Sequence, residues 1–542
     1  MKVMTWNIAA INNNPFEYWI TPPNNRVGES YEKLMKDVEK FILSPGANDV
    51  PVGRVFTQDM FEELKDQMKA VQWEGIEETT RIWDKDLSQR RIVSQFICDA
   101  TIGKKRLISM PDRMTNTIGT RDVGNVCRPT LINCYEGTLG SVSEWWSRWR
   151  TFVFDPKGLN LPKRNKKIDD DGETSTPVWR LFQKIKRSKY PALSEKEERI
   201  SVPLQTLCLA IFDAVLVHMI NTIAPLRVWH PIKLQMSKAL NAEKNERTVQ
   251  ILETAYGDHD VIFLQEVSSM FLLTANKSSA LSKAFHVVTP PVMNARDQNS
   301  IVLMRKSRFE LDESSADMTD LVLRAIRSEN GSDVPVGNGD LVAVRVKERE
   351  TATPVLLCSF HGDTNGLASV PIVRAVHRVA LDKNLSILMG LDANTYRSTS
   401  TTSKRQGVAE FCEVLDKLAL GTCWASSTTI PSTTFNGRTF LQPQLNKSVR
   451  SADMDRARVD ETYEGAEWID RNPKDFILFN EKDRRVLSSS ATQRDNTGKG
   501  PHVTAYRPKD PFPTLEFPSD HAVVSTVLVA ACDEDEKPSS TL

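Results

Sequence analysis

Short apolar runs recur along the chain, and several of them end at a polar residue. The runs at 261–264, 355–359 and 385–389 are continuous and rich in Val, Ile and Leu, which predicts buried strands. The stretches 239–256 and 370–381 carry apolar residues at helical spacing instead. Because several strands occur per helix, the pattern predicts a mixed α/β sandwich of two sheets flanked by helices rather than a regular parallel βαβ repeat.

The region between the first strand and residue 230 has a different pattern. Helical spacing appears at 31–43, 57–71 and 178–186. Of the 11 tryptophans of the chain, most lie in this region: Trp73, Trp83, Trp145, Trp146, Trp149, Trp179 and Trp229. A length of this order is enough for a domain, so we expect a packed and mostly helical lobe.

The stretch 202–226 within that region is almost long and apolar enough to span a bilayer. It also contains Asp213, His218 and Asn221, and prolines lie near both of its ends. These polar residues favour a buried core helix, and membrane association through 202–226 is the alternative. As a core residue, Asp213 needs a buried partner.

Composition limits the classes of partner and compartment. Lys+Arg and Asp+Glu are equal in number, so no global charge attracts the chain to nucleic acid or to acidic membranes, and an anionic partner needs a local patch. The eight cysteines form no CxxC pair, which argues against a structural zinc and against a disulfide framework. No secretory signal is visible at the N-terminus, so we expect an intracellular protein, cytoplasmic or nuclear.

Polar residues stand at the ends of successive predicted strands. They occur in the motifs Trp-Asn, Gln-Glu, Ser-Phe-His, Asp-Ala-Asn, Lys-Asp-Phe-Ile and Ser-Asp-His, as Asn7, Glu266, His361, Asp392, Asn394, Asp475, Asp520 and His521. Carboxylates, amides and histidines delivered together by strand ends are the groups that phosphate-cleaving metal sites use. The sequence therefore predicts a phosphoesterase site.

These six ordered motifs resemble those of the endonuclease/exonuclease/phosphatase superfamily, and the order is far more specific than any single motif. The resemblance implies a four-layered α/β/β/α sandwich of the DNase I-like type with an inserted, mostly helical lobe. It divides the chain into a discontinuous catalytic domain at 1–20 and 231–531, the lobe at 21–230 and an acidic disordered tail at 532–542.

The resemblance also implies roles for individual residues. Asn7 and Glu266 would bind Mg²⁺, with Mn²⁺ as a substitute, and Asp520 would join them on the metal or orient His521. Asp392 would position or deprotonate the attacking water. Asn394 would hold a phosphate oxygen, and His361 would contact phosphate or protonate the leaving oxygen. His521 would act on the nucleophile or hold phosphate, and Asp475 would orient a histidine or the water.

Two details differ from the family pattern or add to it. Leu391 separates Gly390 from Asp392, where the family has the glycine directly before the aspartate. Asn365, in the sequence Asp-Thr-Asn-Gly, is a candidate substrate contact, although the same residues are typical of a plain turn. Asn436, beside Phe435, is the second candidate substrate contact.

Charge in the predicted lobe is asymmetric, with acidic residues in its first half and basic runs such as Lys163–Lys167 in its second. For Trp145, Trp146 and Trp149 a core tryptophan cluster with solvated lysines is favoured. A stacking and phosphate-binding surface formed with the basic residues is the alternative. The run 163–167 also resembles a nuclear-import signal, but an exposed loop is favoured.

The function hypothesis is a Mg²⁺-dependent phosphodiesterase that acts on a phosphate-containing substrate, with nucleic acid favoured. A phosphoinositide or sphingomyelin headgroup phosphoesterase at a membrane is the first alternative, although the inositol phosphatase pattern is absent around Asp392 and Arg397 does not restore it. A binding module with a vestigial active site is the second. The complete set of candidate site residues argues against that last hypothesis.

Overall fold

The chain forms two compact units, each built from separate stretches of sequence. The computed structural model describes residues 1–9, 12–21, 26–161, 175–294, 298–312, 316–330, 334–397, 404–424, 430–463, 467–502 and 504–531. Unit 1 combines Met1–Asn12, Ala242–Asn436 and Ile469–Leu542, and unit 2 combines Asn13–Asn241 with Gly437–Trp468. The basic run 163–167 and the tail 532–542 lie outside the described residues.

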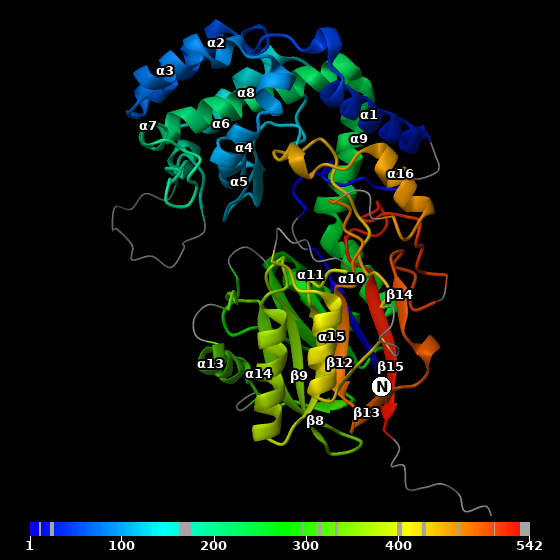
Figure 1. Cartoon of the computed structure of the whole chain (residues 1–542). Coiled ribbons are helices and arrows are strands. Elements are labelled where there is room, and N and C mark those ends of the chain that lie inside the picture. The colour runs from blue at the N-terminus through cyan, green and yellow to red at the C-terminus, as the bar shows by residue number, and fades with distance from the viewer. Residues whose placement is uncertain are drawn as a thin grey trace, which may run out of the picture. The chain divides into compact units, whose positions relative to one another are not determined.

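Unit 1 is a mixed α/β structure with two large sheets (Figure 1). Along the first sheet the described strands follow the order β13-β15-β1-β4-β6-β5, and β14 pairs with β15. These strands are β1 (Lys2–Asn7), β4 (Val261–Val267), β5 (Phe285–Val288), β6 (Asn299–Arg305), β13 (Arg484–Val486), β14 (Gln493–Asp495) and β15 (Val523–Ala530). The second sheet has the order β11-β12-β10-β9-β8-β7. Its strands are β7 (Phe309–Glu310), β8 (Leu341–Glu348), β9 (Pro354–His361), β10 (Ser386–Asp392), β11 (Leu420–Thr422) and β12 (Asp475–Asn480).

The two sheets share a core because alternate residues of each strand point to opposite faces. On β9, Val355 and Leu357 join a cluster with Val261 and Phe263 of β4, so this face packs against the first sheet. Leu356, Cys358 and Phe360 of β9 join a different cluster with residues of the helices on the outer face. Both faces of β9 are thus buried, which explains its continuous apolar sequence.

Helices α13, α14 and α15 lie along the outer face of the second sheet (Figure 1). The helices of unit 1 are α10 (Lys244–Ala255), α11 (Ser269–Lys277), α12 (Ser279–Ala284), α13 (Thr319–Asn330), α14 (Ser369–Asp382) and α15 (Val408–Lys417). The predicted helix at 370–381 corresponds to α14. The stretch predicted as one helix at 239–256 is regular α-helix only from Lys244, since a π-helical turn, Lys238–Ala242, precedes it.

Unit 2 is built mainly from helices (Figure 1). They are α1 (Arg26–Leu43), α2 (Gln58–Ala70), α3 (Ile76–Lys85), α4 (Ala100–Lys105), α5 (Ser109–Thr115), α6 (Val142–Phe154), α7 (Glu195–Arg199), α8 (Ser201–Ile223), α9 (Leu226–Ser237) and α16 (Ser451–Val459), with a hairpin of β2 (Thr117–Gly119) and β3 (Asn125–Cys127). The helix predicted at 178–186 is wrong: only Val178–Leu181 is helical, as a 3₁₀ turn, after Pro177.

Helix α8 is the central helix of unit 2. Among the described residues it is the one helix whose length and composition alone suit a membrane span, and 78% of its most apolar window is buried inside the structure. Its buried Asp213 finds the partners that a core carboxylate needs. Arg128 Nε donates to Asp213 Oδ2 at 2.8 Å, Trp149 Nε1 donates at 2.9 Å, and the Thr130 hydroxyl donates at 2.7 Å.

The tryptophans of α6 do not form a binding surface. Trp145 and Trp149 have no exposed surface, and Trp146 is 5% exposed. The three rings pack on one another, and Trp146 and Trp149 are stacked with centroids 5.6 Å apart. The core cluster favoured from the sequence for Trp145, Trp146 and Trp149 is therefore confirmed, and the alternative stacking surface is wrong, because these side chains are buried in unit 2.

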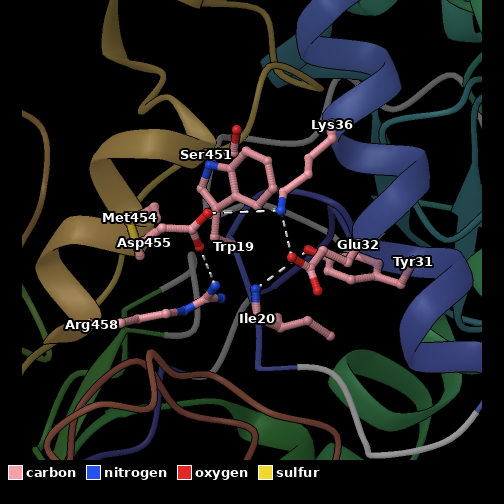
Figure 2. A pocket seen from close by; sticks show the side chains of 9 residues that line it. All are labelled: Trp19, Ile20, Tyr31, Glu32, Lys36, Ser451, Met454, Asp455 and Arg458. Carbon is pink, nitrogen blue, oxygen red and sulfur yellow. Dashed lines mark hydrogen bonds and ion pairs between the residues drawn. The ribbon is translucent and has the colours of Figure 1, made fainter.

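The segment 437–468 belongs to unit 2 although the sequence assigned it to the catalytic domain. Figure 2 shows the contact between its helix α16 and helix α1, in which Lys36 Nζ lies 3.7 Å from Asp455 Oδ2. The main-chain N–H of Ser451 also donates to Glu39 at 2.9 Å. These contacts join residues about four hundred positions apart, which no local sequence pattern reveals.

Candidate active site

Two of the predicted site residues lie at the ends of adjacent parallel strands of the first sheet. Strand β1 runs parallel to β4, and Asn7 is paired in register with Gln265. Glu266 follows directly, at a point where the pairing of β4 with β6 shifts between Leu264 and Val267. Asn7 Nδ2 donates to Glu266 Oε1 at 3.2 Å. The irregularity turns the Glu266 side chain toward Asn7, as bulges often do beside active sites.

Three more predicted residues form one row across the second sheet. Asp392, the last residue of β10, is paired with His361, the last residue of the parallel strand β9. On its other side it is paired with Asp475, the first residue of the antiparallel strand β12. Neighbours in a row project to the same face of a sheet, so the register brings these three side chains together.

Asp475 and His521 form a buried pair. His521 Nδ1 lies 2.9 Å from Asp475 Oδ2, and the two side chains are 0% and 7% exposed. Burial by itself lowers the pKa of His521, but the carboxylates of Asp475 and Asp392 outweigh it and raise the pKa to about 10. His521 is therefore an imidazolium at neutral pH in this arrangement, with Nε2 directed at Asp392.

Asp392 lies at the centre of the site. Its Oδ2 accepts a hydrogen bond from Asn7 Nδ2 at 2.9 Å and lies 3.6 Å from His521 Nε2 and 3.7 Å from His361 Nε2. Burial alone would raise the pKa of Asp392, but the two histidines, with Lys474 and the Asn7 amide, hold it below its usual value. A buried carboxylate that stays ionised beside two imidazoles is suited to accept a proton or to orient a water.

The backbone is unusual at several positions of the site. Ala9, Glu266 and Asn394 have φ angles of 47°, 51° and 47°, in the left-handed region that non-glycine residues rarely adopt. The main-chain N–H of Ala9 donates to Asn7 Oδ1, and that of Asn394 donates to Asp392 Oδ1, both at 2.9 Å. Each strained turn thus fixes the side chain of a site residue just before it, a pattern found at functional sites.

Two predicted phosphate or substrate contacts have an unsatisfied donor. Asn394 and Asn436 are 3% and 5% exposed, and the Nδ2 atom of each is buried with no hydrogen-bond partner. A buried amide without a partner costs about 1–3 kcal/mol. A ligand oxygen would remove that cost, so both amides are consistent with substrate contacts.

Asn365 is placed differently from the other predicted residues. Its side chain is exposed, and the carboxylate of Asp363 accepts hydrogen bonds from the main-chain N–H groups of Asn365 and Ala368. Gly366, with φ +72°, approaches the main-chain oxygens of Ala393 and Asn394 so closely that a side chain would not fit. The Asp-Thr-Asn-Gly sequence is thus a turn that supports the Asp392–Asn394 segment.

The oxygen-rich side of the site suits a hard divalent cation. Glu266 is the most exposed of the central carboxylates, at 22%, and Asp520 is partly exposed. Asn7 presents its amide nitrogen to the carboxylates in this conformation, so its oxygen faces Ala9 instead. A second candidate group is Asp392, Asp475 and His521, whose ligand atoms lie within 4.8 Å of one another. The carboxylates near Glu266 supply the hard oxygen ligands that Mg²⁺ prefers.

Several supporting residues were not predicted from the sequence. Lys244 of α10 is buried, donates to the main-chain oxygen of Ala9, and has Asp520 and Glu266 as its nearest charges. Lys474, just before Asp475, pairs with Asp470 at 2.7 Å. Lys474 could have been found from the sequence, because it lies next to the motif that contains Asp475. Lys244 could not, because in sequence a buried lysine on an amphipathic helix looks the same as a solvent-exposed one.

Two more polar residues connect distant elements at the site. Ser519 Oγ donates to the Asn7 main-chain oxygen at 2.6 Å and accepts from the main-chain N–H of His521 at 3.0 Å. Gln265 Nε2 donates to Ser359 Oγ at 3.0 Å, which links the two sheets directly beneath the site. These hydrogen bonds fix the strand ends that carry the site residues.

The chain has similarities to one family model and to several solved structures. A family model described as a domain of unknown function (DUF8234) matches residues 49–234. No curated protein matches the chain. Similar solved structures include an endonuclease/exonuclease/phosphatase family protein from Bacteroides thetaiotaomicron, with 14% identity over 53% of this chain and 89% of that chain and a TM-score of 0.31.

Two further similar structures have names that mention a ligand. The human nocturnin catalytic domain with bound sulfate is 11% identical over 55% of this chain and 89% of that chain, with a TM-score of 0.32. D. rerio TDP2 complexed with a single-stranded DNA product is 12% identical over 54% of this chain and 95% of that chain, with a TM-score of 0.33. At these values the likeness leaves activity to be argued from the site residues.

Proposed function

We propose that this protein is a divalent-metal-dependent phosphodiesterase that cleaves nucleic acid by direct attack of water. The observation that carries the proposal is the convergence of Asn7, Glu266, His361, Asp392, Asp475 and His521 from six separate stretches of sequence onto one site. Isolated polar residues at strand ends have many structural roles, but a buried set with these mutual distances is typical of a phosphate-cleaving site.

Glu266 and Asp520, with the Asn7 amide oxygen after rotation of its side chain, would hold the cation. Such oxygen ligands fit Mg²⁺, with Mn²⁺ as a substitute. The bound ion supplies polarisation of the phosphate and neutralises its charge. The buried Lys244, next to the same carboxylates, keeps the Asn7–Ala9 turn in place.

The chain's own residues supply the proton transfers and the phosphate contacts. Asp392, held ionised, orients the attacking water and accepts its proton. The imidazolium of His521, fixed by Asp475, donates a hydrogen bond to a phosphate oxygen, and Asn394 Nδ2 donates a second. His361, whose Nε2 lies 3.5 Å from Glu266 Oε1, is placed to protonate the leaving oxygen.

A covalent enzyme intermediate is not expected. Within the described residues, the hydrogen bonds of the His361 and His521 side chains involve no serine or cysteine. A serine or cysteine nucleophile needs a neighbouring base to activate it. Cys358 lies close in sequence to His361, but it is buried in the core on the helix side of β9.

The proposal is tested by a turnover panel on the full chain with Mg²⁺. Single-stranded RNA, abasic DNA, inositol phosphates, sphingomyelin and a small aryl phosphodiester are compared, each with and without chelator. We expect metal-dependent cleavage of nucleic acid, lost in Glu266→Gln and kept in Glu413→Gln, a matched change at an exposed glutamate of α15. Cleavage that survives excess chelator, or an equal loss in both variants, would contradict the proposal.

The same panel separates the alternatives. Turnover of inositol phosphates or sphingomyelin without turnover of nucleic acid would favour a headgroup phosphoesterase. No turnover of any substrate would favour a binding module with a vestigial site.

A further inference from the structure

The segment 430–436 runs beside the catalytic pair in unit 1. Thr434 forms a β-bridge with His521, and the main-chain N–H of Ala522 donates to the Thr433 main-chain oxygen at 2.8 Å. Thr433 Oγ1 accepts from the main-chain N–H groups of Lys474 and Asp475 at 3.0 and 3.1 Å. Thr433 and Thr434 of this segment therefore border the site.

Three arginines from different parts of unit 1 attach to this segment. Arg397 Nη2 donates to the Ile430 main-chain oxygen at 2.7 Å, and Arg494 Nη1 donates to that of Ser432 at 2.6 Å. The guanidinium of Arg471 lies 4.0 Å from the ring centroid of Phe435. Phe435 itself is fully buried, so a ligand could stack on the Arg471 guanidinium but not on the Phe435 ring.

Two tyrosines extend the same arrangement. The Arg494 guanidinium lies 3.7 Å from the ring centroid of Tyr506, whose hydroxyl donates to Ser432. The Arg405 guanidinium lies 4.7 Å from the ring centroid of Tyr396, the residue next to Arg397. Arg405 Nε is buried without a hydrogen-bond partner. We call the set Tyr396, Arg397, Arg405, Arg471, Arg494 and Tyr506 the arginine–tyrosine ledge.

The ledge is partly open to solvent and carries positive charge. Arg397 is exposed, and the other five members are partly exposed. Of the described carboxylates close in sequence to these arginines, Asp470 pairs with Lys474 at 2.7 Å, and Asp495 accepts from Tyr256 and from main-chain N–H groups. This is a local basic patch on a chain whose formal net charge is zero.

Guanidinium groups stacked on aromatic rings suit a single-stranded nucleic acid better than an inositol headgroup or a duplex. Guanidinium planes and tyrosine rings stack on unpaired bases, and the same guanidinium groups contact backbone phosphates. An inositol headgroup has phosphates but no aromatic plane, so it would use the charges and not the stacking surfaces. The bases of a duplex are already stacked on one another and cannot use them either.

We propose that the arginine–tyrosine ledge binds a single-stranded stretch of nucleic acid next to the scissile phosphodiester. This inference rests on the proposed phosphodiesterase function, of which it defines the substrate class. Phosphates of the strand contact Arg405 and Arg397, and bases stack on Tyr506 and on the exposed faces of the guanidinium groups. The ledge places the strand so that one of its phosphates lies at Asp392 and Asn394.

The test measures binding separately from catalysis. A fluorescent single-stranded oligonucleotide of about ten nucleotides is titrated with the full chain in chelator, and anisotropy gives the affinity at several salt concentrations. Arg405→Met should weaken binding about tenfold and reduce the salt slope by about 0.7, the loss of one phosphate contact on a single strand. Arg345→Met, an exposed arginine on β8, is the matched control and should change neither quantity.

A second variant guards against a folding defect. Arg471→Lys keeps the charge and loses the planar group, so we expect binding weaker by several-fold with an unchanged salt slope. Equal affinities for wild type, Arg405→Met and Arg471→Lys would overturn the proposal. So would an equal loss in Arg345→Met, or displacement of the oligonucleotide by inositol trisphosphate at the same phosphate concentration.

These results are distinct from failure of the proposed function. If the protein binds the oligonucleotide through the ledge but cleaves no phosphodiester with Mg²⁺, the proposed role of the ledge stands and the proposed phosphodiesterase function is wrong. If the protein cleaves a small phosphodiester but every variant binds single strands equally well, the phosphodiesterase function stands and the proposed role of the ledge is wrong.

Discussion

Asp475 and His521 lie 46 positions apart in the chain and are joined by a buried hydrogen bond of 2.9 Å. Asp475 opens strand β12 of the second sheet, and His521 lies two residues before strand β15 of the first sheet. The bond therefore crosses from one sheet to the other at the site. It also fixes which nitrogen of the imidazole faces Asp392.

Replacing Asp475 by Asn should lower the pKa of His521, because Asp475 is the largest of the charges that raise it. Nuclear magnetic resonance on histidine-labelled protein follows that pKa, and turnover should fall by about a hundred- to ten-thousand-fold. Asp483→Asn, at a partly exposed aspartate beyond the far end of β12, is the control. An unchanged His521 titration in Asp475→Asn would show that the pair is not coupled in solution.

The same pair makes stability depend on pH. The ordinary pKa of histidine is 6.5 and that of folded His521 is about 10, so its charged form stabilises the fold fully below pH 6.5. That contribution is lost as the pH rises through 10. We expect the melting temperature of wild type to fall over this window more steeply than that of His521→Gln. Parallel curves for the two proteins would contradict the expectation.

Asn394→Gly should separate catalysis from folding. Glycine tolerates the φ of 47° at this position, and the change removes a buried donor that has no partner, so stability should change by less than about 1 kcal/mol. Turnover should fall by about a hundredfold or more through loss of a phosphate contact. Asn384→Gly is a close match, since Asn384 is exposed and has a φ of 51°. Comparable turnover in both variants would exclude Asn394 from the reaction.

Asp213→Asn should destabilise unit 2. The change leaves Arg128, which has no exposed surface, with Asp112 as its remaining carboxylate partner. Removing one member of a buried ion pair costs about 3–5 kcal/mol, which denaturant unfolding monitored by tryptophan fluorescence would detect. Asp84→Asn, an exposed change on α3, should be neutral. A loss below about 1 kcal/mol would mean that the network contributes little.

Lys233→Met tests a buried cation far from the site residues in sequence. Burial lowers the pKa of Lys233 from 10.5 to about 8, so the unfolded chain binds more protons between these values and stability rises with pH across that window. The variant lacks this rise. We therefore expect the difference in melting temperature, Lys233→Met minus wild type, to be largest below pH 8 and to decrease as the pH rises toward 10.5. The control is Lys69→Met on α2, for which this difference should not change with pH.

The sequence by itself determined the local elements and the chemistry at their ends. Buried strands were predictable because continuous apolar runs such as 355–359 are long enough for one strand and too short for a helix. The motifs at Asn7, Glu266, Asp392 and His521 were visible because they follow such runs directly. Their order along the chain was sufficient to indicate the type of site.

The tertiary structure alone decided which segments meet. The packing of 437–468 onto α1, the burial of Trp145 and Trp149, and the contact of Lys244 with Ala9 join residues that are distant in sequence. The arginine–tyrosine ledge arises in the same way, from segments brought around 430–436. Periodicity reports only the environment of a residue along its own element, whereas these contacts depend on strand register and on the packing of sheets and helices.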